Sequence, residues 1–130
     1  MNALLDLVVY MTLLTFLAIM LGAFLRNREW TREGMKAGLS NRDDLPNATP
    51  LGGRAERAAA NSIEALVLFV PLALVAQLAG SVEQVMLGAT IFFWARVAYR
   101  PIYLAGVIYR RSLVWGVGVA GLALLVVALV

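Results

Sequence analysis

The hydrophobic pattern of the chain consists of four long apolar runs separated by polar segments. The runs are 18 to 23 residues long and cover residues 7–25, 58–79, 85–107 and 113–130. A helix needs about 20 apolar residues to cross a hydrocarbon core of roughly 30 Å. None of the runs alternates between polar and apolar residues, as the strands of a membrane β-barrel do. The pattern therefore predicts an all-α integral membrane protein, a four-helix bundle with up-down-up-down topology.

The polar positions between the runs set the expected limits of the helices. Residues 27–53 form the longest polar connection, which we expect to be a cytoplasmic loop with Trp30 at headgroup depth. The second half of this loop, from Gly38 to Gly53, is rich in turn-forming residues and is expected to be irregular. The pattern predicts a single transmembrane domain over residues 1–130, with helices at about 3–26, 54–79, 82–107 and 112–130.

The distribution of charge predicts the orientation in the membrane. All 11 Lys and Arg residues lie between residues 26 and 57, in the second half of the third helix, or in the link before the fourth. Cytoplasmic loops of membrane proteins are enriched in Lys and Arg. We therefore expect loop 27–53 and link 108–112 in the cytoplasm and both termini on the opposite side. The N-terminal segment has no basic start and no cleavage site, so the first helix is expected to be retained.

The composition narrows the chemistry that the chain can perform. Of its residues 62% are hydrophobic, and it contains neither Cys nor His. The absence of Cys excludes disulfides and a protein thiolate, either as nucleophile or as metal ligand. The absence of His removes the usual metal ligand and the usual acid–base group near neutral pH. Any reaction must use Arg, Tyr, Ser, Asn, Glu or a bound cofactor.

Two stripes of polar residues interrupt the apolar helices. Residues spaced three or four apart share one face of a helix. On the second helix, the residues of the stripe are Arg54, Arg57, Asn61 and Glu64. On the third helix, the residues within an arc of about 100° are Arg96, Tyr99, Arg100 and Tyr103. Polar groups so placed must face the bundle interior or a polar cavity.

Glu64 and Arg96 lie deep in the expected membrane spans. Arg96 is about eleven residues, or ~16 Å, from the cytoplasmic end of its helix. A charge at the centre of a membrane helix costs roughly 2.5–3.5 kcal/mol, and such charges tend to pair. We therefore predict an ion pair between Glu64 and Arg96, with Asn61 and Tyr99 completing the hydrogen bonds.

The same stripes allow two interpretations. A buried polar network can simply lock helices together. Against this, arginines outnumber helical acids at one end of the second and third helices, where the only acids are Glu56 and Glu64. The arginines at this end are Arg54, Arg57, Arg96, Arg100, Arg110 and Arg111. An excess of guanidinium groups favours binding of an anion.

Two other sequence features have simpler explanations. Residues 116–121 match the dinucleotide-binding pattern G-x-G-x-x-G but lie inside an apolar span with no preceding strand, so close helix packing is expected. The basic residues could suggest nucleic acid, but seven of them adjoin membrane spans. Anionic lipid headgroups are the more plausible partner of those residues, and no nucleic-acid partner is predicted.

The motifs together resemble the MAPEG family, the membrane-associated proteins in eicosanoid and glutathione metabolism. Its second-helix signature of Arg, Asn and Glu is similar to Arg57, Asn61 and Glu64, with Arg54 also in place. The third-helix signature matches Arg96, Tyr99 and Tyr103, and the fourth-helix signature matches Arg111 and Ser112. The run Asn41-Arg42-Asp43 resembles bacterial members. The resemblance covers nearly the whole chain.

The resemblance implies a homotrimer in the inner membrane of a bacterium, with glutathione as co-substrate between neighbouring subunits and lipophilic substrates entering from the bilayer. Arg111, with Ser112 nearby, would stabilise the glutathione thiolate, although Arg110 is an alternative by one position. The residues implied to bind glutathione are Arg26, Arg54, Arg57, Asn61, Glu64, Arg96, Tyr99, Arg100 and Tyr103.

The leading hypothesis is a membrane-embedded glutathione transferase or peroxidase-like enzyme that acts on lipophilic electrophiles. A second hypothesis is a non-catalytic trimer of the same family that binds lipid or another anion. A third is a small four-helix exporter, which needs an intramembrane carboxylate free to exchange cations. Glu64 lies among arginines that would repel cations, so the exporter ranks last.

Overall fold

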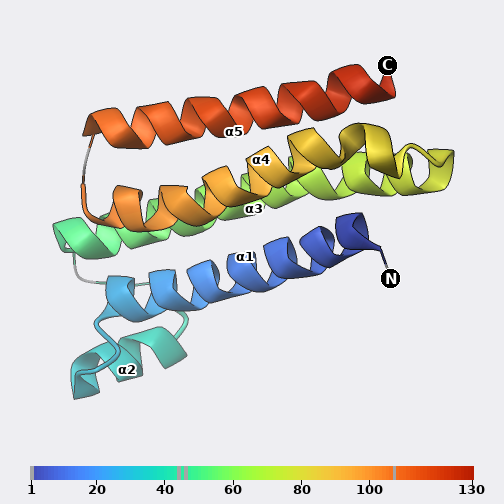
Figure 1. Cartoon of the computed structure of the whole chain (residues 1–130). Coiled ribbons are helices and arrows are strands. Elements are labelled where there is room, and N and C mark those ends of the chain that lie inside the picture. The colour runs from blue at the N-terminus through green and yellow to red at the C-terminus, as the bar shows by residue number, and fades with distance from the viewer. Residues whose placement is uncertain (1, 44, 46, 107) are drawn as a thin grey trace.

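The computed structural model describes residues 2–43, 45, 47–106 and 108–130, and in these residues the chain is all-α, without strands. Figure 1 shows long helices lying side by side in alternating directions, with both termini at one end of the bundle. A short helix lies beside the end of the first. The five helices are α1 (Ala3–Asn27), α2 (Arg32–Leu39), α3 (Pro50–Ala79), α4 (Val82–Leu104) and α5 (Ile108–Leu129).

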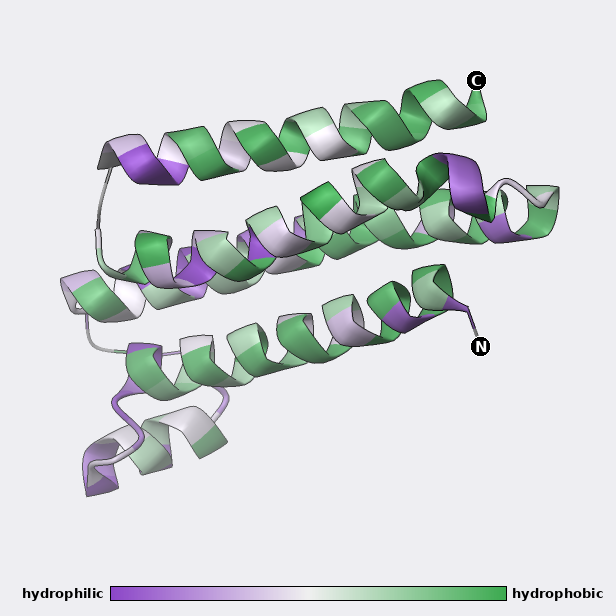
Figure 2. Ribbon diagram, viewed as in Figure 1, coloured by the Kyte–Doolittle hydropathy of each residue, from purple (hydrophilic) through white to green (hydrophobic). Residues whose placement is uncertain are grey.

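Three of these helices, α1, α3 and α5, are long and apolar enough to cross a membrane. Their outward faces carry large exposed apolar side chains, such as Leu17 on α1 and Val67 on α3, as expected for surfaces that face lipid. Helix α4 is 23 residues long but is not among the three. It carries Arg96 and Arg100, and Figure 2 shows hydrophilic residues within the α3–α4 pair toward the end where α4 connects to α5.

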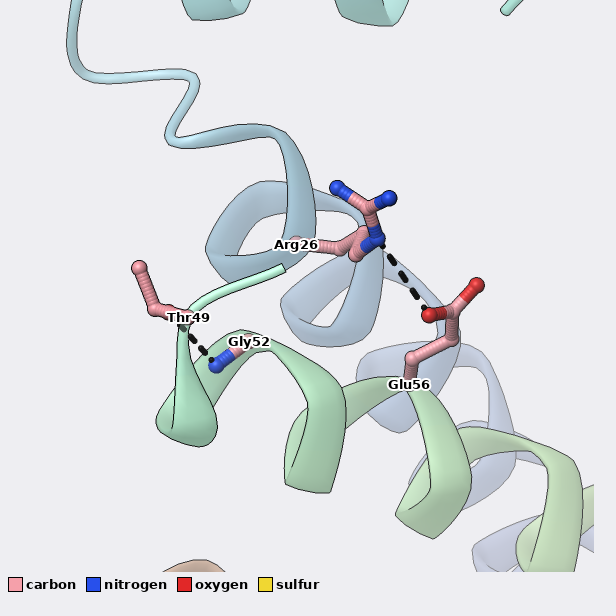
Figure 3. Close-up of polar contacts among 4 residues, drawn as sticks. All are labelled: Arg26, Thr49, Gly52 and Glu56. Atoms are coloured by element: carbon pink, nitrogen blue, oxygen red, sulfur yellow. Dashed lines mark hydrogen bonds and ion pairs between the residues drawn. The ribbon is translucent and has the colours of Figure 1, made fainter. Parts of the chain in front are cut away.

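The helices begin and end differently from the sequence prediction because capping residues decide their limits. Helix α3 begins at Pro50, before the predicted start at residue 54. The Thr49 hydroxyl accepts a hydrogen bond from the Gly52 N–H at 3.0 Å, and proline suits the first helical position. Figure 3 shows this cap. The expectation of an irregular segment from 38 to 53 is therefore wrong at both ends, since α2 extends to Leu39 and α3 begins at Pro50.

Helices α4 and α5 also depart from their predicted limits. Helix α4 ends at Leu104 and not at 107, because Gly106 takes a left-handed conformation with φ of 75°. Helix α5 begins at Ile108, so the predicted basic link before residue 112 is part of the helix. As a result, Arg111 lies within the first turn of α5.

Aromatic stacking and close glycine contacts join the long helices in the core. Phe69 of α3 stacks on Phe92 of α4 with ring centroids 5.3 Å apart. Helices α4 and α5 approach closely at two glycines: a Cβ on Gly88 would lie 2.6 Å from the Gly121 carbonyl oxygen, and a Cβ on Gly121 would lie 2.7 Å from the Phe92 nitrogen. The packing role expected for the glycine-rich stretch therefore holds at Gly121.

Candidate functional site

The two polar stripes of α3 and α4 face each other and are joined by hydrogen bonds. Arg57 donates from Nε to the Tyr103 hydroxyl at 3.0 Å, and one turn further Asn61 donates from Nδ2 to the Tyr99 hydroxyl at 3.4 Å. The pairing follows from geometry, because adjacent antiparallel helices with polar residues every three or four positions bring successive residues into register. The tyrosines and their partners therefore form a ladder between the helices.

Arginines lie over the faces of both tyrosines. The guanidinium carbon of Arg96 is 4.6 Å from the centre of the Tyr99 ring, and that of Arg111 on α5 is 5.0 Å from the centre of the Tyr103 ring. The two rings are 5.4 Å apart. Such cation–π contacts each contribute roughly 0.5–2 kcal/mol. The ladder therefore extends to α5, and it brings positive charge from three helices to one place.

Arg54 continues the ladder at the end of α4. Its Nε donates to the Leu104 carbonyl oxygen at 3.0 Å, and its guanidinium lies beside Gly106. The last carbonyl groups of a helix have no partner within the helix and carry partial negative charge, so a cation there is stabilising. Arg54 thus fixes the end of α4 against the start of α3.

Arg96 is buried with incomplete hydrogen bonding. Its side chain is 6% exposed, and its Nε and Nη2 atoms have no hydrogen-bond partner in the part of the chain that the structure describes. Leaving a buried charged donor without an acceptor costs more than the roughly 1–3 kcal/mol of a neutral one. These two nitrogens suit an acceptor from a ligand, such as a carboxylate.

The predicted ion pair between Glu64 and Arg96 does not form. Among the described residues, the only ion pair within 4.0 Å joins Arg26 to Glu56, at 3.4 Å. The Glu64 side chain is exposed on α3, whereas the Arg96 guanidinium turns onto the Tyr99 ring. Both residues nonetheless line the same cavity. The two charges therefore face a common cavity and are not in direct contact.

This cavity lies between α3 and α5, with α4 as its floor, and has a volume of about 210 Å³. Its polar lining comes from Asn61, Glu64 and Arg96. The rest of the lining is apolar: Ala65, Leu68, Phe92, Ala95, Val114, Trp115, Gly118, Val119 and Leu122. It is therefore an amphipathic cavity, with charge at one end and a hydrophobic remainder.

Two of the predicted site residues, Arg26 and Arg100, lie outside both the ladder and the lining of this cavity. Arg26 forms its ion pair with Glu56 between α1 and α3 (Figure 3), where the Glu56 side chain is 64% exposed, so the pair contributes about 1 kcal/mol or less. Arg100 lines a separate cavity of about 30 Å³ beside α1. Ser112 is exposed in the first turns of α5.

Arg100 is held by Ser62, a residue that the sequence reasoning did not single out. Arg100 donates from Nη2 to the Ser62 hydroxyl at 2.7 Å and from Nη1 to the Arg96 carbonyl oxygen at 2.8 Å. Ser62 is fully buried and donates to the Ala58 carbonyl oxygen. The signal was present, since a buried arginine on α4 requires a polar residue on the facing helix.

Replacing Ser62 with alanine is expected to lower the free energy of unfolding by about 1–3 kcal/mol, because a buried donor of Arg100 loses its acceptor. Thermal unfolding in detergent measures the change. Thr12→Ala is the matched control: Thr12 is exposed and donates within its own helix to the Val8 carbonyl oxygen, so its loss should change stability by about 0.5 kcal/mol or less. Equal effects of the two substitutions would show that the contact between Arg100 and Ser62 does not stabilise the fold.

The fold and the site define a class: a helical membrane protein with arginines and tyrosines gathered between three helices. The sequence model of the MAPEG family matches residues 4–130, so the chain belongs to the MAPEG family. This confirms the resemblance drawn from the motifs, and with the three apolar helices it identifies an integral membrane protein. Comparison with curated proteins and with solved structures gave no match.

Proposed function

We propose that this protein is a membrane-embedded, glutathione-dependent transferase or peroxidase-like enzyme that acts on lipophilic electrophiles. The observation that carries the proposal is the buried Arg96 guanidinium, with two nitrogens free for an acceptor beside an amphipathic cavity. Family membership supports it, because the MAPEG family includes glutathione transferases.

The groups that line the site fit the chemistry of glutathione. The tripeptide carries two carboxylates, one ammonium group and one thiol. Arg57 and Arg96 supply guanidinium groups for carboxylates, which they can bind through paired hydrogen bonds. Glu64 supplies a carboxylate suited to the ammonium group, and Asn61, Tyr99 and Tyr103 supply hydrogen bonds for the peptide groups.

Arg111 is the residue proposed to stabilise the glutathione thiolate. The chain has no Cys and no His, so the sulfur nucleophile comes from the co-substrate. A free thiol has a pKa of about 8.5 and is only a few per cent ionised at neutral pH, and a neighbouring guanidinium increases the ionised fraction. Arg111 is suitably placed because its guanidinium lies over the ring of Tyr103, the tyrosine that Arg57 also contacts.

A homotrimer in which α4 is the fourth membrane span is part of the proposal. The cavity of about 210 Å³ in one chain is smaller than the roughly 300–1,000 Å³ typical of small-molecule sites. Glu64 is exposed on a helix apolar enough to cross a membrane, where contact of a charge with lipid is costly. A neighbouring copy would cover this residue and complete the cavity. In this arrangement the basic segments 27–53 and 108–112 face the cytoplasm of a bacterium, and both termini lie outside.

Isothermal titration of the detergent-solubilised trimer with glutathione tests binding directly. We expect saturable heat at millimolar glutathione or below, and a weaker response with a glutathione analogue that lacks a carboxylate. An intact trimer that gives no heat would refute the proposal. Native mass spectrometry of the same sample examines the alternative, a non-catalytic trimer that binds lipid, which the apolar part of the cavity favours. Retained phospholipid without any response to glutathione would support that alternative.

Replacing Arg111 with glutamine is expected to raise the pKa of the bound glutathione thiol by about one unit or more, equivalent to ~1.4 kcal/mol of lost thiolate stabilisation. The ultraviolet absorbance of the thiolate, followed during a pH titration, measures the change. Arg110→Gln is the matched control because Arg110 is exposed and precedes Arg111 by one position. A shift with Arg110→Gln and none with Arg111→Gln would transfer the role to Arg110.

A further inference from the structure

The short helix α2 has one face packed closely on the end of α1. A Cβ on Gly34 would overlap the carbonyl oxygens of Asn27 and Arg28, and a Cβ on Gly38 would overlap the Glu29 carboxylate. The Thr31 hydroxyl caps the helix by accepting from the Gly34 N–H at 2.9 Å. The atoms that Gly34 meets belong to the backbone and cannot move aside, so only glycine fits there. This contact fixes the rotation of α2, and so it also fixes which residues face outward.

The outward face of α2 combines apolar and basic side chains. On a 3.6-residue helix, Arg32, Met35, Lys36 and Leu39 fall within an arc of about 100°, opposite the two glycines. All four are exposed, and the exposed fraction of Leu39 is 82%. This arc contains two cations and no acid; Glu33 lies to one side of it. We refer to these four residues as the outer face of α2.

The outer face is continuous with the membrane-facing surface of α1. Trp30, which precedes α2 and is 57% exposed, lies against Phe24 of α1 with ring centroids 5.4 Å apart. Phe24 is itself exposed on a helix long and apolar enough to cross a membrane. Tryptophan is typical of the boundary between lipid and water. Figure 1 shows α2 beside the last turns of α1, so α2 lies at the same end of the bundle as this boundary.

We propose that the outer face of α2 docks on the headgroup region of the bilayer and selects anionic phospholipids. Met35 and Leu39 enter the boundary with the acyl chains, and Arg32 and Lys36 extend to the phosphates, as basic side chains beside apolar residues do at membrane surfaces. An isolated eight-residue helix is unstable in water, and the large apolar side chains of α2, Met35 and Leu39, are exposed and not packed on α1. Lipid contact therefore supplies the stabilisation that the packing on α1 lacks. This inference is independent of glutathione binding.

Spin labelling tests the proposal, because the chain has no Cys and each variant carries a single label. Leu39→Cys is labelled with a nitroxide in nanodiscs of phosphatidylglycerol and phosphatidylcholine, and in nanodiscs of phosphatidylcholine alone. Collision rates with oxygen report contact with lipid, and those with a nickel chelate report contact with water. Leu17→Cys on the exposed face of α1 is the lipid reference, and the exposed Ser40→Cys is the water reference.

In nanodiscs containing phosphatidylglycerol, we expect the label at 39 to behave like the label at 17. Adding Arg32→Gln and Lys36→Gln is expected to reduce the ratio of docked to undocked helix by about thirtyfold, from ~1 kcal/mol for each basic residue near an anionic surface. A label at 39 that resembles the label at 40 in these nanodiscs would overturn the proposal. Low collision rates with both reagents would also overturn it, and would indicate a second protein chain on this face. The same lipid contact in phosphatidylcholine alone would refute the anionic selectivity.

Discussion

Replacing Arg96 with methionine is expected to weaken glutathione binding by at least about thirtyfold. Methionine keeps an unbranched side chain but removes the charge and the two buried nitrogens that suit a carboxylate. Truncating one member of a buried, hydrogen-bonded charge pair costs roughly 2–5 kcal/mol, and the lower value corresponds to about thirtyfold. The substitution also leaves the Glu64 carboxylate without the nearby cation that it faces across the cavity. Isothermal titration of the variant and the unmodified trimer in one detergent measures the difference.

Arg100→Met is the matched control for this prediction. Arg100 lies one turn further along α4 and is almost equally buried, but its guanidinium is bound to Ser62 and does not line the ligand cavity. We expect it to lower stability and to leave glutathione affinity within a fewfold of the original. Arg96→Lys provides a second variant if methionine prevents folding, since it retains the charge but loses the paired hydrogen-bonding geometry. Loss of binding in Arg100→Met with normal binding in Arg96→Met would contradict the assignment.

Much of the ladder between α3 and α4 could be predicted from the sequence, because helical periodicity determines which residues share a face. Asn61 and Tyr99 were expected to share a hydrogen-bonded cluster, and Asn61 donates to Tyr99. The contact of Arg57 with Tyr103 was not predicted, but it follows the same periodicity one turn away. The all-α class follows from the lengths of the apolar runs, and family membership was predicted from three spaced motifs. These inferences depend on spacing along the chain, which a single sequence displays directly.

The remaining features depend on choices that spacing does not determine. A helical wheel places Arg96 on a face, but its long side chain can turn toward Glu64 or onto the Tyr99 ring, and the structure has the latter. Arg100 lies within the same arc, yet its guanidinium donates to Ser62, so side chains of one stripe lie in two different environments. The starts of α2 and α3 depend on single capping hydroxyl groups, those of Thr31 and Thr49, within segments whose composition otherwise favours turns.

Gly121→Ala is expected to destabilise the protein by about 1–3 kcal/mol or more, the usual cost of overpacking. The added Cβ would lie 2.7 Å from the Phe92 nitrogen and 2.9 Å from the Gly88 carbonyl oxygen. Both are backbone atoms, which cannot move aside as the end of a flexible side chain can. Helix α5 would therefore shift away from α4 and carry Arg111 away from Tyr103. Thermal unfolding and glutathione titration should both register the loss.

Gly116→Ala gives the opposite expectation on the same helix. A Cβ at Gly116 would meet no atom within 4 Å, so the substitution removes only the entropic disadvantage of glycine in a helix, worth roughly 0.5–1 kcal/mol. The two variants make the same chemical change five residues apart, which separates the steric effect from helix propensity. If Gly121→Ala were as stable as Gly116→Ala, α4 and α5 could not be in backbone contact. The wall that α5 contributes to the ligand cavity would then have to be placed elsewhere.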